Sequence, residues 1–127
     1  MRALLDTSVL IAGDPSLLPD EAAISVASLA ELHFGVQIAR GSNERSRRLT
    51  RLGMVEAEFD PIPVDVAVAR AWGGLAALSA ERGLKRRRRA MDLLIAATAQ
   101  VADLPLISLD EDLRSLADVV DIRPGGV

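Results

Sequence analysis

The feature that most constrains the fold is the alternation of short apolar segments with longer stretches of helical periodicity. Four apolar segments predict strands, at residues 2–5, 22–25, 106–108 and 119–122. Apolar residues recur at helical spacing in residues 26–40, 44–58, 65–82 and 90–102, and shorter helices are expected at 7–12 and 110–116. Short apolar strands separated by helices are typical of a parallel sheet covered on both faces. We therefore expect an α/β fold with a central parallel sheet.

Length and composition limit the chain to one domain. With 127 residues, half of them apolar, we expect a single globular domain over residues 1–127, with 123–127 as a frayed tail. Cysteine is absent, which excludes disulfides, thiolate metal sites and a cysteine nucleophile. No apolar run is long enough to cross a bilayer, so we expect no membrane span and a cytoplasmic protein.

Positive charge is concentrated although the net charge is −3. Of the 15 lysines and arginines, five lie in residues 40–51 and six in residues 82–89. Local patches decide what a polyanion meets at close range. The second cluster directly precedes the helix expected at 90–102, where the helix dipole disfavours cations, so it favours an anionic partner. In the first cluster, we expect a solvated helix face made of Arg45, Arg47, Arg48 and Arg51.

Four carboxylates stand among apolar neighbours, where packing alone does not explain an acid. They are Asp6, after the first strand; Glu31, inside a predicted helix; Asp92, before a long apolar run; and Asp110, after the strand at 106–108. An ionised acid in an apolar setting costs free energy unless a cation or hydrogen-bond donors compensate it.

Each of these acids also has a purely structural explanation. Asp6 and Asp110 could cap the helices that follow them. Glu31 lies three residues after Ser28 and could close a capping box. Asp92 could complement the dipole in the first turn of its helix, and Asp112 is most simply a solvated acid in a first turn.

The expected geometry favours a shared explanation. In an open parallel sheet, ligands bind beyond the carboxyl ends of the strands, and Asp6 and Asp110 both follow predicted strands directly. Glu31 and Asp92 lie on the apolar sides of their helices, which face inward. A pocket of three or four carboxylates suits Mg²⁺ or Mn²⁺, which prefer oxygen ligands.

The segments around these acids resemble a known family. In chain order they are Leu4-Leu5-Asp6-Thr7-Ser8, Ala30-Glu31-Leu32-His33-Phe34-Gly35, Asp92-Leu93-Leu94-Ile95-Ala96-Ala97-Thr98-Ala99 and Ser108-Leu109-Asp110-Glu111-Asp112. This ordered set resembles the four motifs of PIN-domain ribonucleases, in particular the VapC-type toxins of bacterial toxin–antitoxin pairs. Two positions depart from the family pattern, because Ser108 replaces a more usual Thr and Leu113 stands where Phe is frequent.

The resemblance implies both a fold and an activity. The fold would be a PIN-like three-layer α/β/α sandwich, and the protein a homodimer inhibited by a small antitoxin. The activity would be endonucleolytic cleavage of RNA that depends on Mg²⁺, with Mn²⁺ as a substitute. Asp6, Asp92 and Asp110 would hold the metal, and Glu31 would complete the site or position the attacking water. Supporting roles would fall to Thr7, Ser8, Ser108 and Asp112.

The basic segment before Asp92 has three interpretations. The preferred one is RNA binding by Lys85, Arg86, Arg87, Arg88 and Arg89. An acidic segment of the antitoxin is a second candidate partner, and a solvated loop without a binding role is the third.

Other classes of function fit the sequence less well. A phosphoacceptor domain would need a lysine beyond a late strand, and the only lysine, Lys85, precedes a helix instead. His33 is the only histidine, which excludes a His–His metal pair, and we expect it to be structural or on the surface. Trp72 is expected in the core or at a dimer interface. The remaining alternative is a non-catalytic RNA- or protein-binding module on the same fold.

Overall fold

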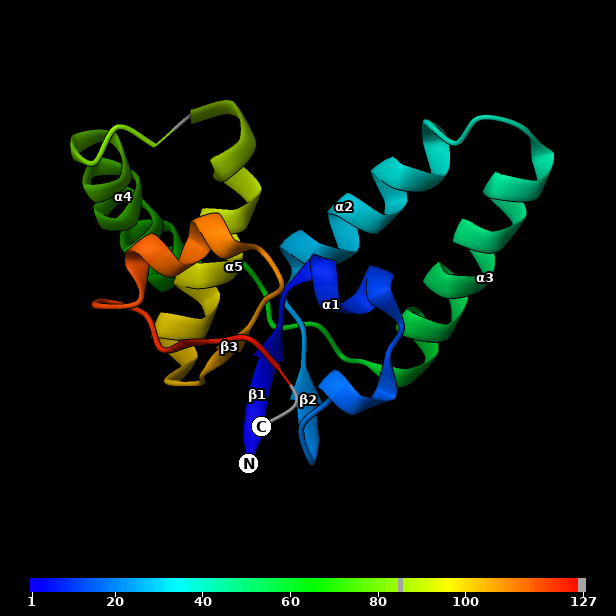
Figure 1. Cartoon of the computed structure of the whole chain (residues 1–127), viewed down its shortest axis with the longest axis horizontal. Coiled ribbons are helices and arrows are strands. Elements are labelled where there is room, and N and C mark those ends of the chain that lie inside the picture. The colour runs from blue at the N-terminus through cyan, green and yellow to red at the C-terminus, as the bar shows by residue number, and fades with distance from the viewer. Residues whose placement is uncertain (85, 126–127) are drawn as a thin grey trace.

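The computed structural model describes residues 1–84 and 86–125, without the side chains of 86–89. The strands and helices occur in the predicted order, with four consecutive helices between the second and third strands (Figure 1). In order, the elements are β1 (Arg2–Leu5), α1 (Thr7–Ala12), a 3₁₀ turn η1 (Pro15–Leu17), β2 (Glu21–Ala23), α2 (Val26–Gln37), α3 (Ser42–Glu58), α4 (Val66–Glu81), α5 (Arg86–Ala102), β3 (Leu106–Ile107), a 3₁₀ helix η2 (Glu111–Leu116) and β4 (Ile122–Arg123).

The strands form one parallel sheet in the order β2-β1-β3-β4, which confirms the predicted sheet. β1 lies at its centre, with β2 on one side and β3 on the other. The chain therefore leaves β1 toward one edge of the sheet and later returns to fill the other. Such a reversal of strand order creates a crevice at the carboxyl ends of the strands. Here that crevice lies where β1 and β3 end, at Asp6 and Ser108.

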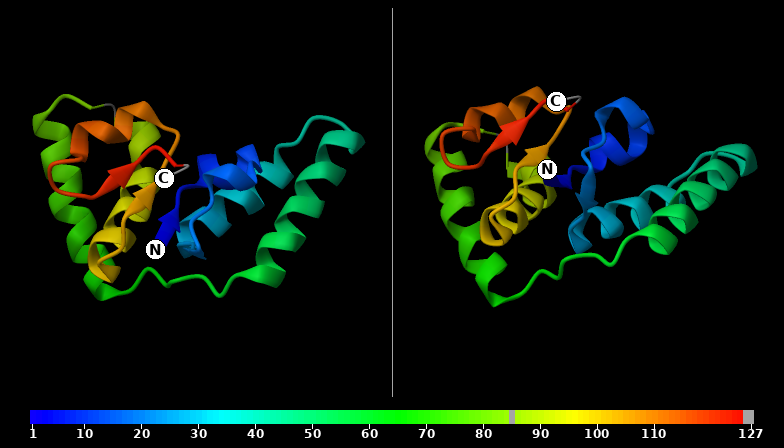
Figure 2. Two further views of the ribbon diagram at one scale, coloured as in Figure 1. Left: turned by 60° about the horizontal axis from the view of Figure 1, so that its bottom comes forward. Right: turned by 90° about the horizontal axis from the view of Figure 1, so that it is seen from below.

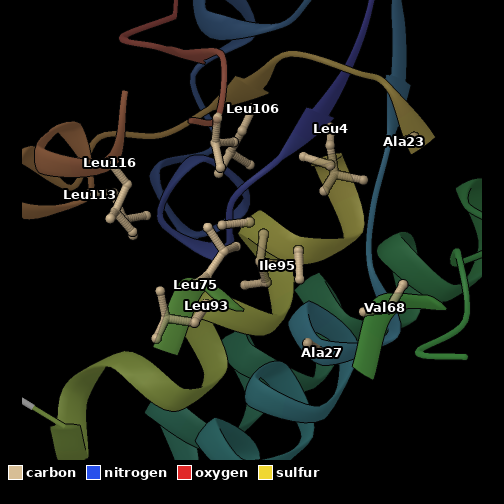
Figure 3. Close-up of a cluster of buried hydrophobic side chains, with 14 residues drawn as sticks. Leu4, Ala23, Ala27, Val68, Leu75, Leu93, Ile95, Leu106, Leu113 and Leu116 are labelled. Atoms are coloured by element: carbon tan, nitrogen blue, oxygen red, sulfur yellow. The ribbon is translucent and has the colours of Figure 1, made fainter. Parts of the chain in front are cut away.

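Helices cover both faces of the sheet, so the molecule has three layers (Figures 1 and 2). Along β1, Leu4 points into one core and Ala3 and Leu5 into the other, as expected for side chains that alternate along a strand. The first core packs Leu4 and Leu106 against α4, α5 and η2 (Figure 3). The second packs Leu5 and its neighbours against α1, α2 and α3.

Local signals explain where several helices begin and end. The Ser25 hydroxyl accepts from Ala27 N at 3.0 Å and starts α2. The Asp65 carboxylate accepts from Val68 N at 2.9 Å and starts α4. α1 ends at Gly13, whose φ of 63° is accessible to glycine without steric cost.

Two predicted boundaries and one predicted helix type were wrong. α5 begins at Arg86 and not at residue 90, in keeping with the good helix propensity of arginine. Residues 111–116 form a 3₁₀ helix and not an α-helix. The last strand begins at Ile122 and not at Val119, because the backbone N–H groups of Val119 and Val120 both donate to Leu116 O and prolong the turn after η2.

The α2–α3 hairpin extends away from the sheet (Figures 1 and 2). Leu32 and Val36 of α2 pack with Leu52 and Val55 of α3 in the second core. Among the described residues, no helix has both the length and the apolar character of a membrane-spanning segment.

Candidate active site

Asp6 lies at the carboxyl end of β1, in the centre of the crevice. Its backbone N–H donates to Ile107 O at 2.9 Å, and its side chain is only 3% exposed. Oδ2 accepts hydrogen bonds from the Ser8 hydroxyl at 2.7 Å and the Ser108 hydroxyl at 2.8 Å. Oδ1 is also buried, but no donor among the described residues reaches it. Asp6 precedes α1 without capping it, so the capping explanation for this acid was wrong.

Glu31 approaches the same place from α2. Its Oε1 accepts from the Thr7 hydroxyl at 2.7 Å, and Thr7 Oγ1 lies 3.0 Å from the buried hydroxyl of Ser28. A hydroxyl donates one hydrogen, so Thr7 donates to the ionised Glu31 and accepts from Ser28. The helix is capped by Ser25 and not by Ser28, which makes the capping-box explanation for Glu31 wrong as well.

Glu31 is held in an environment that disfavours its charge. Half-burial raises the pKa of its carboxyl group above the ordinary value, the Thr7 hydrogen bond partly opposes this, and the nearby Asp6 carboxylate adds to the rise. Two acids close enough to repel each other are stabilised jointly by a cation between them.

Ser108 and Ser8 connect the β3–η2 turn to Asp6. While each hydroxyl donates to Asp6, Ser108 Oγ accepts from Asp110 N at 3.0 Å and Ser8 Oγ accepts from Leu109 N at 3.1 Å. Ser108 thus links Asp110 to Asp6, because its hydroxyl group hydrogen-bonds to both residues. One oxygen of Asp110 accepts from Asp112 N at 2.9 Å, so its capping role at η2 is confirmed. Asp112 is exposed in the first turn of η2, as expected.

Asp92 is half-buried in α5. Because α5 begins at Arg86, Asp92 is not in the first turn, and the explanation by the helix dipole was wrong. Residues three, four and seven positions later, Ile95, Ala96 and Ala99, are fully buried, so Asp92 continues the inward stripe of the helix. α5 begins beyond the carboxyl ends of the strands and runs down beside the sheet, which puts the half containing Asp92 at the crevice end (Figure 1).

The structure therefore connects several of the predicted site residues by hydrogen bonds. Asp6, Ser8 and Ser108 form one hydrogen-bonded set with the backbone of Asp110. Glu31 and Thr7 form a second hydrogen-bonded set, close enough to the first for the Asp6 carboxylate to raise the pKa of Glu31. Across the described part of the chain, no group of three or more acidic or histidine side chains is arranged so that it could hold a metal ion. Lys85 and the side chains of Arg86, Arg87, Arg88 and Arg89 lie outside the described residues.

The crevice nevertheless has the donor chemistry that a hard divalent cation requires. A buried carboxylate oxygen without a donor is costly, and a cation is the partner that removes this cost. The available groups are carboxylate and hydroxyl oxygens, which Mg²⁺ and Mn²⁺ prefer over nitrogen or sulfur. Mg²⁺ also keeps several water ligands, so a few carboxylates suffice to hold it.

Sequence reasoning missed two features near Glu31. Ser28 supports Thr7, but its position three residues before Glu31 indicated a cap. Arg51 lines a pocket with Glu31, although the arginine-rich stretch indicated a solvated face. His33 is exposed, with Nε2 3.6 Å from Glu56 Oε2, and Trp72 donates from Nε1 to Ala90 O at 3.0 Å beside the first core, so both predictions were correct.

Known proteins resemble this chain over nearly its whole length. The PIN domain family model matches residues 3–119. Ribonuclease VapC5 of Mycobacterium tuberculosis is 43% identical over 94% of this chain and 91% of the relative. Ribonuclease VapC4 of the same organism is 36% identical over 93% of each chain.

A solved structure agrees with these sequence matches. The crystal structure of VapBC-5, a member of the VapBC family of toxin–antitoxin systems from M. tuberculosis, includes a chain that superimposes with a TM-score of 0.82 at 40% identity and covers 96% of this chain and 95% of that one. The parallel sheet, the acids at its carboxyl edge and the near full-length matches together show that this chain belongs to the PIN-domain family, and within it to the VapC ribonucleases.

Proposed function

We propose that this chain is the toxin of a toxin–antitoxin pair and a divalent-metal-dependent endoribonuclease. The observation that carries the proposal is the buried carboxylate of Asp6, with one oxygen lacking a donor, at the point where the strand order reverses. The relatives named above are ribonucleases, and the structural relative comes from a toxin–antitoxin complex. Because RNA is the proposed substrate, we also propose that the protein acts in the cytoplasm.

In the proposed site, Asp6, Asp92 and Asp110 would hold Mg²⁺, for which Mn²⁺ would substitute. When bound, the ion would lower the pKa of a water molecule and offset charge that develops on the phosphoryl oxygens. Asp6 is prepared for this role because Ser8 and Ser108 occupy Oδ2 and leave Oδ1 free to coordinate. Glu31, fixed by Thr7, accepts a hydrogen bond from the attacking water and aligns it with the phosphorus.

The proposal also covers how the protein attracts RNA and which proteins it binds. Lys85 and Arg86 to Arg89 precede Asp92 in the sequence and are proposed to attract RNA phosphates. A cognate antitoxin is proposed to block the same crevice, and a homodimer is the proposed state of the free toxin.

The decisive experiment incubates the purified protein with defined RNAs in Mg²⁺ or Mn²⁺, or with a chelator, and maps the cut ends. We expect internal cleavage that chelation abolishes and that Asp6→Asn removes without loss of RNA binding. Asp14→Asn is a matched control, because Asp14 is an exposed acid whose side chain only caps η1. If Asp6→Asn cleaved as fast as the parent after removal of contaminating nuclease, the catalytic proposal would be wrong. RNA binding without cleavage by the parent would instead support the non-catalytic module.

A further inference from the structure

A second polar pocket lies beside the candidate active site. It has a volume of about 210 Å³ and is formed between α1, α2 and α3, whose arrangement Figure 1 shows. Its lining residues are Ile11, Glu31, Leu32, Gly35, Glu44, Arg48 and Arg51. The volume is several times the ~30 Å³ that one water molecule occupies in the liquid, so the pocket can take a larger group. Glu31 belongs both to this pocket and to the acid site, so whatever binds here lies next to the reaction.

Two arginines in this pocket differ in how their charge is used. Arg48 is held by two hydrogen bonds, because its Nε donates to Glu44 at 2.8 Å and its Nη1 donates to Gly35 O at 2.6 Å. Glu44 also pairs with Arg47, so one carboxylate serves two guanidinium groups. Arg48 therefore connects α3 to α2, and these contacts fix its position.

Arg51 is half-buried one helical turn further along α3. Among the described residues it donates no hydrogen bond and forms no ion pair. A guanidinium group has five N–H donors in a planar fork that suits a phosphate. Two arginines and two glutamates line the pocket, so their formal charges sum to zero. Glu44 is already paired with Arg47 and Arg48, whereas Arg51 has no carboxylate partner among the described residues.

We propose that Arg51 binds a backbone phosphate of the RNA substrate next to the scissile one. The inference rests on the proposed ribonuclease function and adds a subsite to it. A phosphate is the expected ligand because the half-buried guanidinium group of Arg51 offers a planar set of N–H donors without an acceptor among the described residues, and because the pocket shares Glu31 with the proposed reaction site. The neighbouring cavity of about 290 Å³, between α1 and α3, is lined largely by apolar residues such as Leu10, Met54 and Phe59, and is the better place for a protein partner. Arg51 lines both cavities.

The test measures RNA binding separately from cleavage. A single-stranded RNA that the parent cuts is titrated against Asp6→Asn with and without Arg51→Gln, over a series of salt concentrations. We expect Arg51→Gln to weaken binding roughly tenfold at low salt. We also expect the slope of log affinity against log salt to become less negative by about 0.7, the value for one phosphate contact in a single strand. In the cleaving background, Arg51→Gln should raise KM more than it lowers kcat.

Matched variants separate a phosphate contact from net charge and from misfolding. Arg47→Gln removes the same charge from the same helix at a side chain that is 68% exposed, and should keep the parental salt slope. Arg51→Lys retains the charge and should recover part of the affinity, while unchanged thermal unfolding shows that α3 is intact.

Each other outcome has a definite meaning. An Arg51→Gln variant with parental affinity and salt slope would overturn the subsite. Loss of antitoxin binding with RNA binding unchanged would also overturn it and assign Arg51 to the protein partner. A parent that binds RNA without cutting it, and loses one phosphate contact on Arg51→Gln, would keep the subsite and reject the ribonuclease function. A parent that binds no RNA would reject both.

Discussion

The two oxygens of the Asp6 carboxylate have different surroundings, and this difference is the central chemical fact at the residue scale. Oδ2 is saturated by two serine hydroxyls, while Oδ1 is buried without a donor. A group of this kind destabilises the metal-free fold and is stabilised by a cation, so function and stability are expected to change in opposite directions on mutation.

Asp6→Asn is therefore expected to leave the metal-free protein at least as stable as the parent. It should also abolish stabilisation by Mn²⁺, which in the parent amounts to about 2.7 kcal/mol at a free metal concentration about 100 times Kd. Calorimetric unfolding with metal and with chelator checks both statements. Equal stabilisation of parent and variant by Mn²⁺ would remove Asp6 from the metal site.

The raised pKa of Glu31 predicts a pH dependence of stability. An acid with a pKa higher in the folded state than in the unfolded state binds protons more tightly when folded. The contribution of Glu31 to stability is complete at pH values below its pKa in the unfolded state, near 4.5. It is lost as the pH rises through the higher pKa of the folded state. In chelator, the parent should gain stability relative to Glu31→Gln as pH falls toward 4.5. Denaturant unfolding at a series of pH values measures the difference. If the free energies of unfolding of the parent and of Glu31→Gln changed in parallel with pH, the raised pKa of Glu31 would be contradicted.

At the scale of elements, the β3–η2 turn is joined to β1 by hydroxyl groups. Ser108→Ala removes a donor from Asp6 and the acceptor of Asp110 N together. Because partners that orient a ligand set metal affinity, we expect a loss of ~10–100-fold in Mn²⁺ affinity, and Ser108→Thr should retain most of it. Isothermal titration with metal measures this. Ser115→Ala, which removes an exposed hydroxyl from η2, is the control and should bind metal as the parent does.

The 3₁₀ helix η2 is anchored to the first core by Leu113 and Leu116, both buried (Figure 3). Leu113→Ala leaves a cavity under this short element and is expected to cost about 2–5 kcal/mol of unfolding free energy. Urea denaturation measures the cost. Leu49→Ala, at a position 50% exposed on α3, should change stability by less than about 0.5 kcal/mol.

At the scale of the whole molecule, the proposed assemblies can be tested by mass. The proposed homodimer predicts a mass in solution of twice the 13.5 kDa chain, measured by light scattering coupled to size-exclusion chromatography. Addition of the cognate antitoxin should increase this mass. RNA cleavage should stop at the same ratio of antitoxin to toxin at which the mass increases. A monomeric parent that cleaves RNA would contradict the proposed dimer while leaving the active site unaffected.

The sequence by itself determined the α/β class, the parallel sheet and the positions of the acids at strand ends. These properties depend on local periodicity and on which residue follows a strand, and both are visible in the sequence. Apolar periodicity misplaced the start of the last strand at Val119, because hydrogen bonds to Leu116 O prolong the preceding turn. It also misplaced the start of α5 at residue 90, because the arginines before that residue are polar but good helix formers.

Only the tertiary structure decided which oxygen of Asp6 is free, which hydroxyl holds Glu31 and which arginine faces the pocket. The hydrogen bond from Ser108 to Asp6 joins residues 102 positions apart, and the one from Thr7 to Glu31 joins residues 24 apart. Periodicity predicts which face of its own helix or strand a side chain lies on, but it does not predict how one element packs on another. Contacts between elements depend on that packing, and the chemistry of this site is made of such contacts.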